Sequence, residues 1–229
     1  MSNSQGQVLP GRKLAEAYMG AREVVVGAGF GRELDWQDSR DFSVVTESEF
    51  LAEAAWVVLS AGLSERVVHR VFGSISQSFC QWNSASAIVS RRRSCVAQAM
   101  KVFAHKPKIR AIAEIAAQVN QHGFARIKRE VEALGVERLS ELPFIGPVTS
   151  FHLAKNLGLD VVKPDRHLVR LAKAAQVADP YALCSMIAAW TGDRMATVDL
   201  ILWRFATLER NYERVFRVTT RHDRTLNSR

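Results

Sequence analysis

The 229-residue sequence has few of the features that support a cross-linked, metal-bound or membrane-embedded protein. Its three cysteines, Cys80, Cys95 and Cys184, are scattered and form no C-x-x-C pair. This argues against a disulfide framework, a zinc ribbon and an iron–sulfur cluster. No apolar run approaches the length of a membrane span, and the first residues lack the apolar core of a signal peptide. We therefore expect a cytoplasmic protein with no membrane partner.

Strand patterns are also nearly absent, and positive charge exceeds negative charge. The net charge is +8 with a sequence pI near 9.8, so the chain attracts polyanions. Nucleic acid is the leading partner, although a solvated basic face is an equal alternative on charge alone. With 48% hydrophobic residues the chain can bury a core, as one domain or two intimate lobes.

Helical periodicity and helix-boundary residues predict an all-α protein. Thr46 and Glu49 have the spacing of a capping box before an apolar segment. The glycine-rich segment 27–31 lacks the G-K-[ST] ending of a phosphate loop, so we expect a flexible connector. The polar, basic tail 211–229 is expected to be partly disordered or to lie along DNA. The expected helices are 13–26, 50–59, 64–72, 86–103, 107–120, 125–134, 135–142, 147–156, 165–175, 180–190 and 193–208.

The segment 142–149, Leu-Pro-Phe-Ile-Gly-Pro-Val-Thr, predicts a tight turn before a helix. Pro143 fixes one φ angle, Gly146 permits a positive φ, and Pro147 suits the first turn of the next helix. The amides of Gly146, Val148 and Thr149 would then face an anion, attracted also by the helix dipole. The alternative is a helix corner that is capped by water.

A single carboxylate follows one helix later, in Lys163-Pro164-Asp165-Arg166-His167. Pro164 pushes Lys163 toward an extended conformation, which places Asp165 in the first turn of a helix. Such an aspartate is often only a helix cap. Together with the turn, however, it would allow the protein to hold a DNA phosphate and to place an acid group against a nearby sugar.

These residues resemble the helix-hairpin-helix (HhH-GPD) DNA glycosylase superfamily. Segment 142–149 is similar to its L-P-G-[IV]-G-x-[KxR]-[TV] hairpin, and segment 163–170 to its V-D-T-H-V-x-R segment. Asp165 follows Gly146 by 19 residues, which is also similar to the family spacing. Segment 56–64 resembles the family's I-L-S-Q-Q-T helix end, and more closely the S-A-G-L-S version of Tag-type 3-methyladenine DNA glycosylases. The resemblance spans about 50–205.

The resemblance implies one glycosylase unit over 1–229, with a two-lobed all-α fold and an active-site cleft between the lobes. The central lobe would be 46–135. The terminal lobe would be 1–45 plus 136–210, carrying the hairpin 138–157, and 211–229 would be a basic tail. The resemblance also implies a monomer that binds double-stranded DNA, associated with the nucleoid in a bacterium.

Residue roles carry over by motif. Asp165 matches the catalytic aspartate, which would stabilise an oxocarbenium-like sugar and position water. Four hairpin amides would hold a phosphate, and two further side chains would contact phosphate. Three carbonyls would hold a structural monovalent cation, K⁺ or Na⁺, and no other cofactor is required. The amides belong to Phe144, Gly146, Val148 and Thr149, the side chains to His167 and Lys163, and the carbonyls to Ser140, Leu142 and Ile145.

Two residues depart from the family pattern. Val148 stands where bifunctional relatives carry the lysine that attacks the sugar, which favours a monofunctional enzyme that uses water. Phe144 replaces the first glycine of the hairpin and would alter the turn, affecting the cation site more than the phosphate contacts. Lys155 and Lys163 are interpreted as solvated or phosphate-contacting residues.

An enzyme that acts on a base in a duplex must flip it out and fill the gap. Leu63 is near the position of the family's wedge residue, and Trp56, Trp82 or Phe103 would stack on the flipped base. For the aromatic residues, a core position is the more common alternative. Glu53 or Glu65 would supply a general acid, unless each is a surface or capping carboxylate. Basic residues that would line the DNA path are Arg91, Arg92, Arg93, Lys106, Lys108, Arg126, Lys128 and Arg129.

The sequence therefore predicts a monofunctional DNA N-glycosylase that flips out a damaged or modified base, hydrolyses the base–sugar bond and leaves an abasic site. The segment 61–64 favours alkylated purines. The alternatives are a glycosylase for oxidised, mismatched or hypermodified bases, and a non-catalytic helix-hairpin-helix DNA-binding protein.

Overall fold

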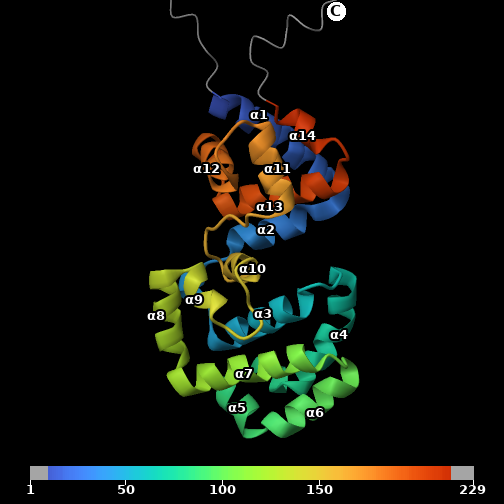
Figure 1. The fold of residues 1–229 in the computed structure, drawn as a ribbon, viewed down its shortest axis with the longest axis vertical. Helices are drawn as coiled ribbons and strands as arrows, with labels where there is room; N and C mark the ends of the chain where they lie inside the picture. The colour runs from blue at the N-terminus through green and yellow to red at the C-terminus, as the bar shows by residue number, and fades with distance from the viewer. Residues whose placement is uncertain (1–9, 218–229) are drawn as a thin grey trace, which may run out of the picture. The chain divides into compact units, whose positions relative to one another are not determined.

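The computed structural model describes residues 10–217, and all regular secondary structure within that range is helical, which confirms the all-α prediction (Figure 1). The chain divides into two compact units. The central unit is Arg40–Leu159. The terminal unit combines the described residues up to Ser39 with those from Asp160 onward. No helix in 10–217 is both long enough and apolar enough to cross a membrane.

The terminal unit is built around α1, which packs against α12 and α13. Its core includes the fully buried Tyr18, Leu171 and Ile201. The predicted connector 27–31 is instead a kinked helical segment, η1, in which Gly29 supplies a left-handed residue (φ 93°). The elements are α1 (Pro10–Val25), η1 (Val26–Phe30), α2 (Gly31–Ser39), α11 (Arg166–Ala174), α12 (Pro180–Thr191), α13 (Met195–Leu208) and α14 (Tyr212–Val215).

The first part of the basic tail belongs to this core. Tyr212 and Phe216 are 5% and 1% exposed, and α14 packs against α11 and α13. We expected part of 211–229 to be disordered or to lie along DNA, and within this tail residues 211–217 pack against the terminal unit. Two aromatic residues spaced for one helix face suffice to anchor a short helix despite the polar residues around them. Residues 218–229 lie outside the described range.

The central unit surrounds α7, which packs against α3, α5, α6 and α8. Thr46 and Glu49 form the predicted capping box at the start of α3. The elements are η2 (Phe42–Val44), α3 (Glu47–Ser60), α4 (Glu65–Ser78), η3 (Cys80–Trp82), α5 (Ala85–Ser90), α6 (Arg92–Val102), α7 (Lys106–His122), α8 (Phe124–Leu134), α9 (Val136–Ser140) and α10 (Thr149–Asn156).

Two backbone irregularities of this unit differ from expectation. The predicted single helix 86–103 is broken at Arg91, which ends α5 and precedes α6. Before it, Cys80, Gln81 and Trp82 all have positive φ angles (55°, 54° and 61°). The left-handed turn directs Trp82 into the core, where it is 4% exposed.

The hairpin belongs to the central unit, not to the terminal lobe that we expected. Contacts of α9 with α8 and of α10 with α3 account for this grouping. The side-chain amide of Asn156, at the end of α10, donates to Glu53 on α3 at 2.9 Å. Gly158 (φ 93°) then stops α10 as predicted, and a Cβ there would lie only 2.7 Å from the amide nitrogen of Asp41. Only glycine fits this conformation and this contact.

Candidate functional site

The turn between α9 and α10 is anchored by three buried aliphatic side chains. Leu139, Leu142 and Ile145 are 0%, 2% and 3% exposed. The amide of Ile145 donates to the carbonyl of Leu142 at 3.0 Å, which closes the turn. The side chains between and after these anchors face outward, since Phe144 is 44% and Val148 52% exposed. The core thus presents the tip of the hairpin to solvent.

The left-handed residue of this turn is Phe144, with φ 67°, and not Gly146. Gly146 would permit a positive φ, but the chain reverses two residues earlier. A Cβ at Gly146 would contact only the Thr149 hydroxyl, at 3.9 Å. A left-handed conformation is uncommon for a bulky residue and is a form of local backbone strain.

The amides of the turn differ in their availability. Gly146 donates its amide to the Thr149 hydroxyl at 2.7 Å, so this amide, which we expected to face an anion, already has an acceptor. For the amides of Val148 and Thr149, residues 10–217 provide no acceptor. They lie at the N-terminus of α10, where the helix dipole favours an anion.

The ring of Phe144 rests on two residues from the start of α7. His105 lies edge-on to it, with ring centroids 6.3 Å apart, and Lys108 Nζ is 5.8 Å from the ring centroid. On its other side His105 stacks on Phe103, with centroids 5.8 Å apart and planes 9° apart. No pattern in the sequence indicated this role of His105, which also caps α7 by accepting the Lys108 amide at 3.4 Å.

Lys108 is a structural residue. We had expected it to line a DNA path, and this expectation was wrong. It is 2% exposed, and its Nζ donates to the carbonyls of Leu59 and Ala61, each at 2.6 Å. These carbonyls lie at the end of α3, where helical partners are lacking. Burial lowers the pKa of Lys108. Lys128 is similarly engaged, with its Nζ 2.6 Å from the carbonyl of Ser43.

Asp165 is the N-cap of α11. Its Oδ1 accepts the amides of His167 at 2.8 Å and Leu168 at 3.0 Å. No donor to its Oδ2 occurs in the described part of the chain, and the residue is half-buried. The preceding loop is held by the Lys163 amide, which donates to the buried carboxylate of Asp199 at 2.6 Å. The helix therefore holds one carboxylate oxygen and leaves the other available.

His167 is oriented by Tyr212 of α14. Its Nδ1 lies 3.2 Å from the hydroxyl of Tyr212, and Arg166 Nε approaches its Nε2 at 3.3 Å. Tyr212 is buried, so the imidazole has a fixed position beside the start of α11. The sequence did not indicate that Tyr212 has this role, because Tyr212 belongs to the polar, basic segment 211–229, which has little periodicity.

Of the expected pocket aromatics, Trp82 is a core residue, whereas Trp56 and Phe103 are half-buried. Trp82 stacks on Phe79 at 5.4 Å, and its 4% exposure is too small for the predicted contact with a flipped base. Trp56 is half-buried and lies edge-on to Phe72 and His69, at 5.1 and 4.7 Å. Leu63, the expected wedge residue, follows α3 and is half-buried.

The two candidate acids differ in environment. Glu53 accepts a hydrogen bond from Asn156, and burial raises its pKa, while Asn156 and Arg40 oppose that shift. Glu65 is exposed and pairs with His69 one turn along α4, at 3.5 Å. Glu53 is thus part of the packing between α3 and α10, and Glu65 is a surface carboxylate in the first turn of its helix.

The three carbonyls expected to hold a cation lie before and within the turn, at Ser140, Leu142 and Ile145. The Leu142 carbonyl already accepts the amide of Ile145. Carbonyl oxygens have two lone pairs, so this bond leaves acceptor capacity. Within 10–217 no group of three or more His, Cys, Asp or Glu side chains is arranged to hold a metal ion. The monovalent cation stays a prediction.

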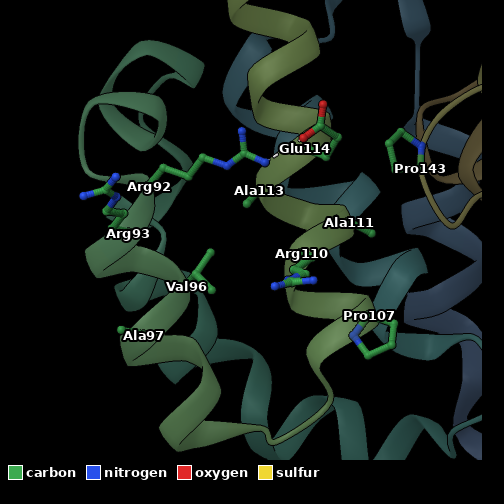
Figure 2. A pocket seen from close by; sticks show the side chains of 10 residues that line it. All are labelled: Arg92, Arg93, Val96, Ala97, Pro107, Arg110, Ala111, Ala113, Glu114 and Pro143. Atoms are coloured by element: carbon green, nitrogen blue, oxygen red, sulfur yellow. Dashed lines mark hydrogen bonds and ion pairs between the residues drawn. The ribbon is translucent and has the colours of Figure 1, made fainter.

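A basic groove of about 890 Å³ lies between α6 and α7, and a residue of the hairpin turn, Pro143, also lines it (Figure 2). Figure 2 shows Arg92 reaching from α6 to Glu114 on α7, where Nη2 and Oε2 are 2.6 Å apart. Three arginines and one glutamate leave the groove with a positive balance. The lining residues are Arg92, Arg93, Val96, Ala97, Pro107, Arg110, Ala111, Ala113, Glu114 and Pro143.

Comparison with known proteins finds a likeness of fold. No family model matches the sequence, and no curated protein matches it. The structure is similar to that of an 8-oxoguanine glycosylase/lyase from Methanocaldococcus jannaschii in complex with a 15mer DNA containing 8-oxoguanine. The TM-score is 0.55 at 19% identity, covering 83% of this chain and 97% of that chain. The chain therefore has an all-helical fold that is similar to the fold of this glycosylase/lyase.

Proposed function

We propose that this protein is a monofunctional DNA N-glycosylase, which hydrolyses a base–sugar bond with water and leaves an abasic site. The observation that carries the proposal is the Asp165 carboxylate, held through Oδ1 by the amides of His167 and Leu168 while Oδ2 lacks a donor in the described chain. The proposal is also supported by the likeness of fold to a DNA glycosylase/lyase.

In the proposed reaction the bond between the base and C1′ breaks, and its electron pair leaves with the base, which takes up a proton. The sugar becomes oxocarbenium-like. A carboxylate with a fixed position stabilises the developing positive charge without reorganising during the reaction. Water then adds its oxygen to C1′ and loses a proton. The role of Asp165 in this scheme is electrostatic support and positioning of the water.

Val148 supports a mechanism without a covalent amine intermediate. Its aliphatic side chain stands where the resemblance places the attacking lysine, and a valine cannot form a Schiff base. Lys155, later in α10, is 8% exposed, and Lys108 is held by two carbonyls. In this respect the proposal departs from the glycosylase/lyase that shares the fold.

For the substrate we propose double-stranded DNA, bound by a monomer. The free amides of Val148 and Thr149 would hold one phosphate, with His167 and Lys163 contacting the backbone. The groove that contains Arg93 and Arg110 would receive further phosphates next to the hairpin. A K⁺ or Na⁺ ion on the Ser140, Leu142 and Ile145 carbonyls would stabilise the turn.

The test is a base-excision assay that compares the wild type with Asp165→Asn. Duplexes carrying single modified bases are incubated with protein and treated with hot alkali, which cuts abasic sites. Alkylated purines come first, because segment 61–64 favours them, followed by oxidised, mismatched and hypermodified bases. Asparagine is also a good N-cap, so Asp165→Asn should fold normally.

Asp179→Asn is the matched control, because Asp179 caps α12 through the Ala182 amide at 2.8 Å. We expect this control variant to keep wild-type excision and Asp165→Asn to lose it. If no substrate is cut above the Asp165→Asn background while duplex binding persists, the protein is a non-catalytic DNA-binding protein. If borohydride traps a covalent complex between the wild type and DNA, the protein has an amine nucleophile and is not monofunctional.

A further inference from the structure

Phe144 combines features that packing alone does not explain. Its backbone is left-handed (φ 67°), a conformation that favours glycine. The hairpin motif that this segment resembles has glycine at this position. Phe144 is nevertheless 44% exposed, so it adds little to the buried core. A strained backbone that presents a half-exposed aromatic ring is a candidate for a binding function.

The ring is contacted by two side chains of the central unit. Lys108 Nζ is 5.8 Å from its centroid and is itself held by the carbonyls of Leu59 and Ala61. His105 lies edge-on at 6.3 Å and is supported by Phe103. These contacts restrict the ring while leaving almost half of the residue open to solvent, which reduces the entropy lost when a ligand stacks on it.

The neighbourhood indicates the chemical class of that ligand. Val148 and Thr149, four and five residues later, present unbonded amides suited to a phosphate. Pro143, the residue before Phe144, lines the groove of Arg93 and Arg110. An aromatic surface flanked by phosphate-binding groups fits a nucleotide, whose base has a flat face and whose phosphate lies one sugar away.

We propose that the Phe144 ring is a stacking site for an unpaired nucleobase. The base that it would hold is not the excised one, and the site rests on the DNA binding proposed above. Stacking on an aromatic ring tolerates any base, so the site recognises the loss of pairing and not the base identity. It would hold a base left without its partner when the duplex is distorted at the hairpin.

The experiment uses the full chain and duplexes that carry 2-aminopurine, either fully paired or unpaired opposite an abasic analogue. Affinity is measured by anisotropy and stacking by quenching of 2-aminopurine fluorescence. We expect the wild type to quench the unpaired probe. Phe144→Gly should lose this quenching and bind the unpaired duplex about tenfold more weakly, the size expected for one stacked base. Its affinity for the paired duplex should change less than about twofold.

Two controls separate stacking from folding. Phe144→Gly relieves the left-handed strain, so its melting temperature should equal or exceed that of the wild type. Phe144→Trp keeps an aromatic ring and should retain quenching. Tyr181→Ala removes an aromatic residue that is 60% exposed in the terminal unit, and it should leave both signals unchanged.

The outcomes also distinguish this site from the proposed enzyme activity. The stacking site is wrong if Phe144→Gly binds the unpaired duplex as tightly as the wild type, or weakens both duplexes equally. If the wild type excises no base yet quenches in a Phe144-dependent way, the glycosylase proposal fails and the stacking site stands. If the wild type binds neither duplex, DNA binding itself fails and both proposals are overturned.

Discussion

Gly146 and Thr149 close the start of α10 through a reciprocal pair of bonds. The Gly146 amide donates to the Thr149 hydroxyl at 2.7 Å. The same hydroxyl donates back to the Gly146 carbonyl at 3.2 Å. The Thr149 hydroxyl is therefore the acceptor of the Gly146 amide, which is not available to a bound anion. After Gly146, the next amides, those of Val148 and Thr149, two and three residues further along the chain, have no acceptor within 10–217 and are available to a phosphate.

Thr149→Val removes that acceptor while keeping the shape of the side chain. The half-buried Gly146 amide then lacks its partner, and we expect the free energy of unfolding to fall by about 1 kcal/mol. Thr149→Ser keeps the hydroxyl and should lose much less. Urea denaturation followed by circular dichroism measures both. Equal stability of the valine and serine variants would mean that the bond contributes nothing to the hairpin.

Local signals in the sequence were sufficient wherever neighbouring residues determine the structure. The Thr46 capping box, the stop at Gly158 and the start of α11 at Asp165 all depend on residues within one helical turn. Phe144 and Gly146 show the limit of such reasoning. Glycine permits a positive φ, but the anchoring of Leu142 and Ile145 in the core decides where the chain reverses, and this placed the left-handed residue at Phe144.

Long-range contacts account for most of the other differences. Lys108 looked like a surface cation, and its burial follows from carbonyls of α3, about fifty residues earlier in the chain. Tyr212 looked like part of a polar tail, and its position depends on α11 and α13. In each case the neighbouring residues are polar and predict an exposed side chain. The side chain is buried because of contacts with residues distant in the sequence, which periodicity cannot reveal.

Lys108→Met tests the role of that buried ammonium group. Methionine fills a similar space but leaves the carbonyls of Leu59 and Ala61 without their donor, so we expect a loss of about 2–3 kcal/mol in the free energy of unfolding. Lys106→Met, at an exposed position of the same helix, is the control and should change stability by less than about 0.5 kcal/mol. Thermal and urea unfolding report the difference. A stable Lys108→Met protein would show that water replaces the ammonium at these carbonyls.

Glu53→Gln tests the effect of burying a carboxylate between α3 and α10. Burial raises the pKa of Glu53 in the folded state, so the folded protein holds this proton more tightly than the unfolded chain does. The stability contributed by the protonated form is present below the unfolded pKa, about 4.3, and is lost as the pH rises through the folded pKa. Glutamine, which cannot ionise, should make the protein more stable than the wild type at pH 7.

The advantage of Glu53→Gln should shrink toward pH 4, where the wild type is also protonated. The carboxamide oxygen of the introduced glutamine would still accept the hydrogen bond from Asn156, so packing is preserved. Melting curves between pH 4 and pH 8, approximate limits set by the ordinary carboxyl pKa, measure the trend. Glu132→Gln, at an exposed position on α8, should show no such trend. A pH-independent difference between Glu53→Gln and the wild type would contradict the assignment to burial.

The basic groove between α6 and α7 leads us to predict how DNA affinity depends on salt concentration. If Arg93 and Arg110 each neutralise one DNA phosphate, Arg93→Ala and Arg110→Ala should each reduce the slope of log K against log salt by about 0.9. Arg12→Ala is the control, because the guanidinium of Arg12 is paired with Glu16 at 3.0 Å and does not line the groove. Its slope should stay near that of the wild type. Anisotropy titrations with one unmodified duplex at several salt concentrations measure all three variants, and unchanged slopes for Arg93→Ala and Arg110→Ala would exclude the groove from the DNA path.

Val148→Lys addresses the chemistry that separates this chain from the glycosylase/lyase with the same fold. The side chain at position 148 is 52% exposed and follows the turn directly, so a lysine there would carry an accessible amine. The resemblance places this amine where relatives attack C1′, and a primary amine forms a Schiff base that borohydride reduces to a stable adduct. We expect Val148→Lys, but not the wild type, to become covalently attached to a duplex with an abasic site.

Val148→Arg separates nucleophilicity from charge in that experiment. Arginine adds the same positive charge and improves phosphate contact, but its guanidinium stays protonated and does not attack a carbonyl. It should therefore bind the abasic duplex at least as tightly as the wild type and give no trapped adduct. An adduct with the arginine variant or the wild type would place the reactive amine on another lysine. Tight binding by Val148→Lys with no adduct would mean that position 148 does not face C1′ and that the family alignment of the hairpin is shifted.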